Sequence, residues 1–236
     1  MNREQLQKDF FPTELMLKLY RDIPESEYET KIKLVNDYIE EVRHSYDEDV
    51  LKIKQQNQIA HIYWTSELYQ QAINHFEIVV KSMEPEDYHS IYFLALNLLI
   101  RGNILLSNYK EAEKWAELAF ENHHLADAIS NLHILNDYCD VITKTETFLD
   151  KKHHPLIQSI IDEYGFPEIL GDPVETIRSM QKRYKFWARK MGELELASVS
   201  TDLNYTILAY ENYINSCEIE WFRKYALESI ENIKNK

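Results

Sequence analysis

The stretch QNQIAHIYWTSELYQQAINHFEIVVKSMEP, residues 56–85, holds two runs of apolar residues at the three- and four-residue spacing of helices. Ala60 and Tyr63 belong to the first run, and Ala72 and Phe76 belong to the second. These four residues suit a tightly packed pair, because small side chains let two backbones approach closely and aromatic rings fill the space beside them. The stretch therefore predicts a helical hairpin that ends near its final proline.

Helical spacing continues through most of the 236 residues, which include only 4 Gly and 6 Pro. With 44% apolar and 28% charged residues, the balance is that of a folded protein. No segment shows sustained period-two alternation bounded by turn residues, so strands are not expected. After a short opening helix and a helix that follows Pro24, the helices are predicted at about residues 47–65, 67–83, 86–106, 109–121, 125–149, 154–164, 173–191, 201–215 and 218–233.

The sequence Gly171-Asp172-Pro173 marks the clearest internal boundary, because Asp caps helices and Pro fits the first helical turn. We expect residues 1–170 to form a helical-hairpin region, and residues 171–236 a C-terminal helical region that packs on it within one continuous domain. Short loops make sequential helices antiparallel neighbours. The predicted fold class is all-α, with antiparallel helical hairpins stacked as a short superhelix, and an irregular helical bundle is the alternative.

Residues 56–85 resemble a tetratricopeptide repeat, a helical hairpin in which small and aromatic residues recur at fixed positions. Gln56 departs from the large apolar residue that the family prefers, and Val79 from the preferred Ala. The matching residues are Ile59, Ala60, Tyr63, Tyr69, Ala72 and Phe76, and a weaker copy follows at Gly102, Asn103, Tyr109, Ala112, Ala116 and Ala119. Tyr69 and Tyr109 are 40 residues apart, against about 34 for the family repeat. Because Gly102 also lies closer to Ala112 than Ala60 does to Ala72, we expect a distorted second hairpin or a lengthened first helix in it.

The resemblance implies a TPR-like superhelix whose concave face is lined by the first helix of each pair. Lys54, Asn57, His61, Trp64 and Thr65 are then the residues expected to face the groove and bind a partner. Trp64 is the expected anchor, because aromatic side chains often dominate binding at interfaces. The alternative is that this tryptophan packs against the next helix.

The net charge of −14 is unevenly distributed along the chain. Residues 1–150 carry 27 Asp and Glu against 14 Lys and Arg, whereas residues 151–200 carry 7 against 8. An acidic surface repels nucleic acid and anionic membranes and can steer a basic protein into contact, although acidity can also serve solubility alone. No secretory signal is evident, and the longest apolar stretch, Ile91 to Ile100, is too short to span a bilayer. We therefore expect a cytoplasmic protein that binds neither nucleic acid nor membrane.

Basic and aromatic residues also alternate in the predicted helix that follows Pro173. Its apolar stripe is Ile177, Met180, Tyr184, Trp187 and Met191, and the opposite face carries Arg178, Lys182, Lys185 and Arg189. An ordinary amphipathic helix has this arrangement, whereas nucleic-acid binding needs both kinds of residue on one face. In the last two predicted helices, Tyr205, Tyr210, Tyr213, Trp221 and Tyr225 could cap the superhelix or form a dimer face, which leaves the oligomeric state open.

Residues with catalytic or metal-binding potential are sparse. Three Glu-x-x-His pairs, Glu41/His44, Glu86/His89 and Glu121/His124, place a carboxylate and an imidazole on one helix face, as di-iron bundles do. Two of them sit at predicted helix ends rather than mid-bundle, so we predict no metal and no cofactor. The adjacent pairs His123-His124 and His153-His154 are expected to be C-terminal helix charges or solvated loop residues.

Neither the two cysteines nor the short motifs of the sequence indicate a known catalytic site. Cys139 and Cys217 lack Cys-x-x-Cys spacing and are expected to be partly buried free thiols. No Gly-rich phosphate loop, nucleophile elbow or zinc-helix motif occurs in the sequence. An enzymatic site would have to be assembled from scattered residues.

Three function hypotheses follow from these observations. The first is a non-enzymatic module that binds another protein or peptide, expected to be basic. A small acidic helical protein of this kind resembles bacterial immunity proteins, which neutralise a partner toxin by covering it. The second is a peptide- or ligand-responsive helical-repeat regulator, and the third is a metal-dependent helical-bundle enzyme.

Overall fold

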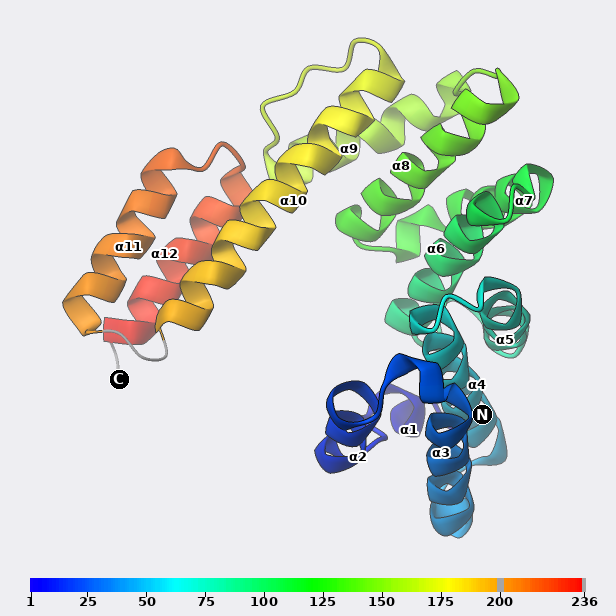
Figure 1. Cartoon of the computed structure of the whole chain (residues 1–236). Helices are drawn as coiled ribbons and strands as arrows, with labels where there is room; N and C mark the ends of the chain where they lie inside the picture. The colour runs from blue at the N-terminus through cyan, green and yellow to red at the C-terminus, as the bar shows by residue number, and fades with distance from the viewer. Residues whose placement is uncertain (199–201, 235–236) are drawn as a thin grey trace.

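The computed structural model describes residues 1–198 and 202–234, and all regular secondary structure within them is helical (Figure 1). The helices are α1 (Arg3–Gln7), α2 (Thr13–Leu17), α3 (Tyr28–Val42), α4 (Glu48–Thr65), α5 (Tyr69–Lys81), α6 (His89–Leu105), α7 (Tyr109–Glu121), α8 (Ala128–Thr145), α9 (His154–Tyr164), α10 (Pro173–Ser198), α11 (Leu203–Ser216) and α12 (Glu220–Lys234). Short 3-10 or π turns are η1 (Lys18–Asp22), η2 (Glu25–Glu27), η3 (Arg43–Ser45), η4 (His123–Leu125) and η5 (Lys151–His153). The all-α prediction is confirmed.

From α3 onward the helices pack in chain order, so that each contacts the next helix in the sequence. Contacts run from α3 through α4, α5, α6, α7 and α8 to α9, and α6 also touches α8. In Figure 1 this series curves from α3 toward α9, and α10, α11 and α12 form a group at the other end of the arc. Helix α10 packs on α8 and α9, and α12 also reaches α9. This arrangement is consistent with a helical-repeat fold.

The first helices of three successive helix pairs are alike in length and in the cap that follows them. Helices α4, α6 and α8 contain 18, 17 and 18 residues. Each is followed within two residues by a residue with left-handed backbone, Glu67, Ser107 or Glu146, and the N–H after that residue donates to a carbonyl five residues earlier. This hydrogen bond is that of a Schellman cap, which satisfies a carbonyl at the helix end. The structure thus contains a third pair, α8 with α9, that the repeat pattern in the sequence did not reveal.

Compared with the first hairpin, the second shows neither the distortion nor the lengthened first helix that its spacing predicts. Leu68 N–H donates to the Tyr63 carbonyl at 2.9 Å, and Asn108 N–H makes the equivalent bond to the Asn103 carbonyl at 2.7 Å. Helices α5 and α7 both contain 13 residues, and α6 is one residue shorter than α4. Gly102 therefore occupies the position of Ile62 rather than that of Ala60. The second hairpin has the same turn and nearly the same length as the first.

The two small residues at the centre of the predicted hairpin are buried, but the predicted aromatic pair is divided. Ala60 and Ala72 are both fully buried in the core that α4 and α5 share. The Tyr63 ring stacks on His75 at 5.4 Å, whereas Phe76 meets His61, with ring centroids 5.2 Å apart. Tyr63 and Phe76 thus fill different spaces, because adjacent helix residues such as His75 and Phe76 point in different directions around the axis of α5.

Gly102 brings α6 close to the first hairpin. A Cβ atom at this position would lie 3.0 Å from Ile73 Cγ1 and 3.3 Å from Trp64 Cζ3. Glycine leaves room for both side chains, so the first and second pairs pack closely at this point.

Several predicted boundaries differ from the structure. The helix predicted over residues 125–149 is α8, which is shorter because Asp127 caps the N–H groups of Ile129 and Ser130 and Glu146 turns left-handed. Helix α10 continues beyond the predicted end to Ser198, and the predicted start at Thr201 lies outside the described residues. None of the described helices is both long and apolar enough to cross a membrane.

Candidate functional site

The N-terminal half of the predicted binding face on α4 is covered by the chain's own first residues. Lys54 Nζ donates a hydrogen bond of 3.0 Å to the Lys8 carbonyl and lies 5.4 Å from the centroid of the Tyr88 ring. Only 8% of Lys54 is exposed, and burial lowers the pKa of its ammonium while nearby Asp9 opposes the shift. The Lys54 ammonium thus makes an internal contact with the backbone of residue 8.

The covering segment, residues 2–11, is anchored at several points. Leu6 is fully buried and Phe10 nearly so. Arg3 Nε lies 2.6 Å from a carboxylate oxygen of Asp87, and the Tyr38 hydroxyl donates to the Phe10 carbonyl at 2.9 Å. Because these anchors spread over α3, α4 and the turn before α6, the segment stays fixed on the face.

A small cavity remains between this segment and α4. Its volume is about 240 Å³, and its walls include Lys54, Asn57, Phe11, Met16 and Ile91. Asn57 Oδ1 is buried in the structure without a hydrogen-bond partner. Of the predicted groove residues, Lys54 and Asn57 are therefore the two that share one cavity.

The other three predicted groove residues make internal contacts. His61 packs edge-on against Phe76, and burial lowers its pKa. The Trp64 ring meets Tyr69 at 5.3 Å and approaches Gly102 of α6, which is the packing role considered as the alternative. The Thr65 hydroxyl donates to the Ile62 carbonyl of its own helix. A binding role for these residues stays a prediction.

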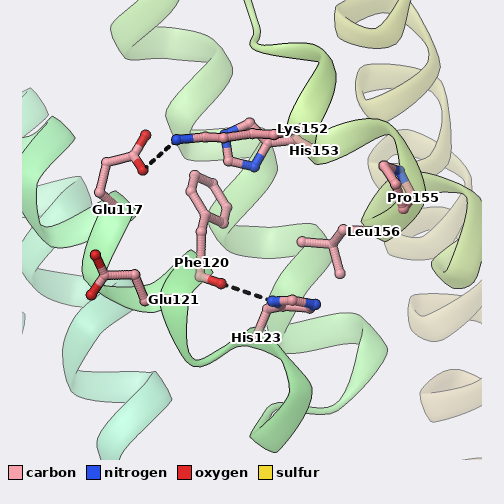
Figure 2. Close-up of a pocket in the computed structure, with 8 residues that line it drawn as sticks. All are labelled: Glu117, Phe120, Glu121, His123, Lys152, His153, Pro155 and Leu156. Atoms are coloured by element: carbon pink, nitrogen blue, oxygen red, sulfur yellow. Dashed lines mark hydrogen bonds and ion pairs between the residues drawn. The ribbon is translucent and has the colours of Figure 1, made fainter.

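A second cavity, between α7 and the start of α9, was not anticipated from the sequence. Its volume is about 310 Å³. The lining residues, shown in Figure 2, are Glu117, Phe120, Glu121, His123, Lys152, His153, Pro155 and Leu156. No local sequence motif predicts this cavity, because its two sides come from segments that are 35 residues apart in the chain.

Charged groups line the mouth of this cavity. Glu117 and Glu121 are one helical turn apart on α7, so both carboxylates lie on the same side of that helix. The Lys152 ammonium lies 2.8 Å from Glu117, and the same contact is drawn in Figure 2. Glu117, Asp150 and Glu121 all act to raise the pKa of Lys152, the hydrogen bond to Glu117 most strongly. Among the described residues no ion pair reaches Glu121, so one carboxylate at the mouth is free of a cationic partner.

His153 lies deeper, against the aromatic wall. It is 4% exposed, and its ring centroid is 4.4 Å from that of Phe120. Nε2 is buried and has no hydrogen-bond partner. Burial lowers the pKa of His153, so the imidazole is mainly neutral at pH 7. The prediction of a solvated or helix-C-terminal residue is wrong for His153, which precedes α9 and faces the core.

The remaining residues with chemical potential are separated. Among residues 1–198 and 202–234, no group of three or more His, Cys, Asp and Glu is placed to hold a metal ion. All six residues of the Glu-x-x-His pairs are exposed. Cys139 and Cys217 are buried free thiols, and burial raises the pKa of Cys139 to about 12. A thiol with so high a pKa is a poor nucleophile at neutral pH.

The basic face of α10 is partly used for packing. Arg178 donates to the Asn136 carbonyl at 3.0 Å and lies 2.5 Å from the Asp140 carboxylate, so it joins α10 to α8. Ile177, Met180 and Met191 are buried, as the apolar stripe predicts. Tyr210 and Tyr213 are also buried, whereas Tyr205 is 65% exposed.

Comparison with known proteins gives no further identification: no family model, no curated protein and no solved structure matches the chain.

Proposed function

We propose that this chain is a non-enzymatic protein-binding module, a short stack of TPR-like hairpins that binds a basic protein partner. The observation that carries the proposal is the excess of acidic residues in the first 150 residues of the chain. Residues 1–150, which include α4 to α8, hold 27 acidic and 14 basic side chains. An acidic scaffold of this kind accelerates encounter with a basic protein and disfavours anionic ones.

The repeated plan of the helix pairs supports the scaffold part of the proposal. Three pairs with equivalent caps present successive helices at one side, as repeat proteins do when they form extended binding surfaces. The helical fold and the acidity of the chain also suit a bacterial immunity protein, which neutralises a toxin by covering it. That version is the more specific form of the same proposal.

Co-expression with the products of neighbouring genes tests both forms. The expected result is a complex with one neighbour that survives gel filtration and weakens as ionic strength rises, because salt screens charge attraction. Protection of cells from the toxicity of that neighbour would support the immunity version. If no neighbour forms a complex, the immunity version fails, and a complex that does not weaken in high salt contradicts the electrostatic basis of the proposal.

One observation favours the alternative of a peptide-responsive regulator. The face of α4 already holds the non-helical residues that follow α1, with Lys54 bound to the Lys8 carbonyl and Phe10 buried. A peptide that took the place of this segment would change the exposed surface of the protein. Screening a peptide library by thermal shift tests this function, since a ligand of the folded state raises the melting temperature. Absence of stabilisation by every peptide counts against it.

A further inference from the structure

We infer that the cavity between α7 and α9 binds an arginine side chain of the basic partner. The inference rests on the proposed function and specifies the contact that recognises the partner. The polar groups that surround the cavity are two carboxylates on α7, the Lys152 ammonium and the imidazoles of His123 and His153, of which His123 already contacts the Phe120 carbonyl through Nδ1 at 2.8 Å.

The hydrogen-bonding capacity of these groups favours a donor-rich ligand. Ionised Glu117 and Glu121 are acceptors only, and a neutral imidazole offers one acceptor nitrogen. His153 Nε2 has no partner in the structure, although the residue is 4% exposed. A buried polar atom without a partner is costly, so a ligand that bonds to it gains affinity. A guanidinium carries five donors and no acceptor, which matches this set of groups.

The Lys152 contact shows that the cavity mouth accepts a cation. Its ammonium is held by Glu117 at 2.8 Å, while 53% of the lysine side chain remains exposed. An exposed ion pair of this kind contributes little to stability, so an incoming cation can displace the lysine. Glu121, which no ion pair reaches among the described residues, offers a carboxylate whose two oxygens can accept a bidentate pair of hydrogen bonds from a guanidinium.

The walls select arginine over a small inorganic cation. Phe120, Pro155 and Leu156 are apolar lining residues, and Figure 2 shows the Phe120 ring between the α7 carboxylates and Leu156. A guanidinium is planar, weakly hydrated and able to pack on aromatic surfaces, whereas an ammonium is strongly hydrated. Lys152 and the start of α9 would attract an anion, but the two glutamates face the same space and repel it.

Binding of N-acetyl-arginine methylamide, followed by NMR at low salt, tests the inference in the full chain. We expect saturable shifts centred on Phe120, His153 and Leu156, and no such shifts with the neutral citrulline analogue or with inorganic phosphate. Equal shifts with citrulline, shifts with phosphate, or tighter binding of the lysine analogue would overturn the assignment to arginine.

Three variants separate a specific contact from general acidity. Glu117→Gln with Glu121→Gln should weaken binding at least tenfold, whereas Glu111→Gln, on the same helix and paired with Lys114, should leave it unchanged. Lys152→Met removes the internal competitor and should strengthen binding severalfold, an effect that loss of folding cannot produce. Equal weakening by Glu111→Gln, or weakening by Lys152→Met, contradicts the inference.

The partner itself distinguishes failure of the site from failure of the function. If a neighbour-encoded protein binds the wild-type chain and the Glu117→Gln/Glu121→Gln variant equally, the cavity is not the arginine site and the protein-binding function stands. If the arginine analogue binds in the cavity but no protein partner is found, the site stands and the proposed function fails.

Discussion

Glu67 and Ser107 adopt the same left-handed backbone, with φ of 60° at each, at the same place in two hairpin turns 40 residues apart. Neither is glycine or asparagine, the residues that ordinarily take this conformation. The turn geometry is therefore imposed by the packing of the flanking helices and their caps. Because Glu67 and Ser107 are equivalent, the second hairpin aligns with the first at an offset of 40 residues.

Replacing Glu67 with glycine should stabilise the protein. Relief of the left-handed strain, less the extra freedom of glycine in the unfolded chain, gives an expected gain of about 0.5–1 kcal/mol. Chemical denaturation measures it. The matched control is Gln71→Gly, an exposed helical position in α5, which should cost about 1 kcal/mol. A loss of stability in Glu67→Gly would show that its side chain has a structural role.

The hairpin of residues 56–85 could be predicted because its pattern is local. Ala60 and Ala72 are small where helices meet, and few glycines or prolines interrupt the chain. The register of the second pair could not be predicted, because Ser107 gives no composition signal for a left-handed cap. The prediction that Gly102 is the equivalent of Ala60 in the second hairpin is wrong for the same reason.

Gly165 should not tolerate alanine. Its φ is +62°, and a Cβ atom there would lie 2.5 Å from Glu220 Cβ at the start of α12. Strain and overlap together should cost at least about 1–2 kcal/mol. Gly171→Ala is the matched control, because nothing lies within 4 Å of its Cβ position and its φ is not in the left-handed region. Equal melting temperatures for the two variants would contradict the close contact between α9 and α12.

Stability should fall as the pH drops below about 6.5, the ordinary pKa of histidine. Burial lowers the pKa of His61, His133 and His153 in the folded state. The unfolded chain therefore takes up protons first, and the free energy of unfolding decreases until the pH passes the lowered folded values. Urea denaturation between about pH 8 and pH 5.5 measures the slope. Asp137 acts in the opposite direction, because burial raises the pKa of its carboxyl in the folded state and the folded chain then takes up that proton first.

His153→Gln should reduce that slope, because one of the buried imidazoles is removed. An unchanged slope would mean that His153 takes up a proton as readily in the folded chain as in the unfolded one. NMR titration of the ring protons assigns the effect to the residue.

The cavities depended on contacts that no local pattern encodes. Glu117 and Lys152 are separated by 35 residues, and Lys54 and Lys8 by 46. Helix periodicity indicates which residues face inward, but it does not tell which distant segment covers them. For this reason Lys54 was expected in an open groove, and the structure instead places residues 2–11 over it.

Leu6→Ala tests how firmly that segment is held. Leu6 is fully buried and belongs to the main core, so truncation should cost about 2–4 kcal/mol if the segment stays in place. If the segment detaches instead, the loss is limited to its own docking energy, and amide protons of residues 2–10 exchange faster while those of α6 keep their protection.

Lys8→Ala is the control, because it removes only an exposed side chain paired with Glu4 and leaves the backbone carbonyl that Lys54 binds. Faster exchange confined to the segment in Leu6→Ala, with none in Lys8→Ala, is the expected result, since the anchors of the segment lie on elements that pack without it. Equal loss of protection in the segment and in α6 would show that the two unfold together, in which case the face of α4 is part of the core and is not available to a partner.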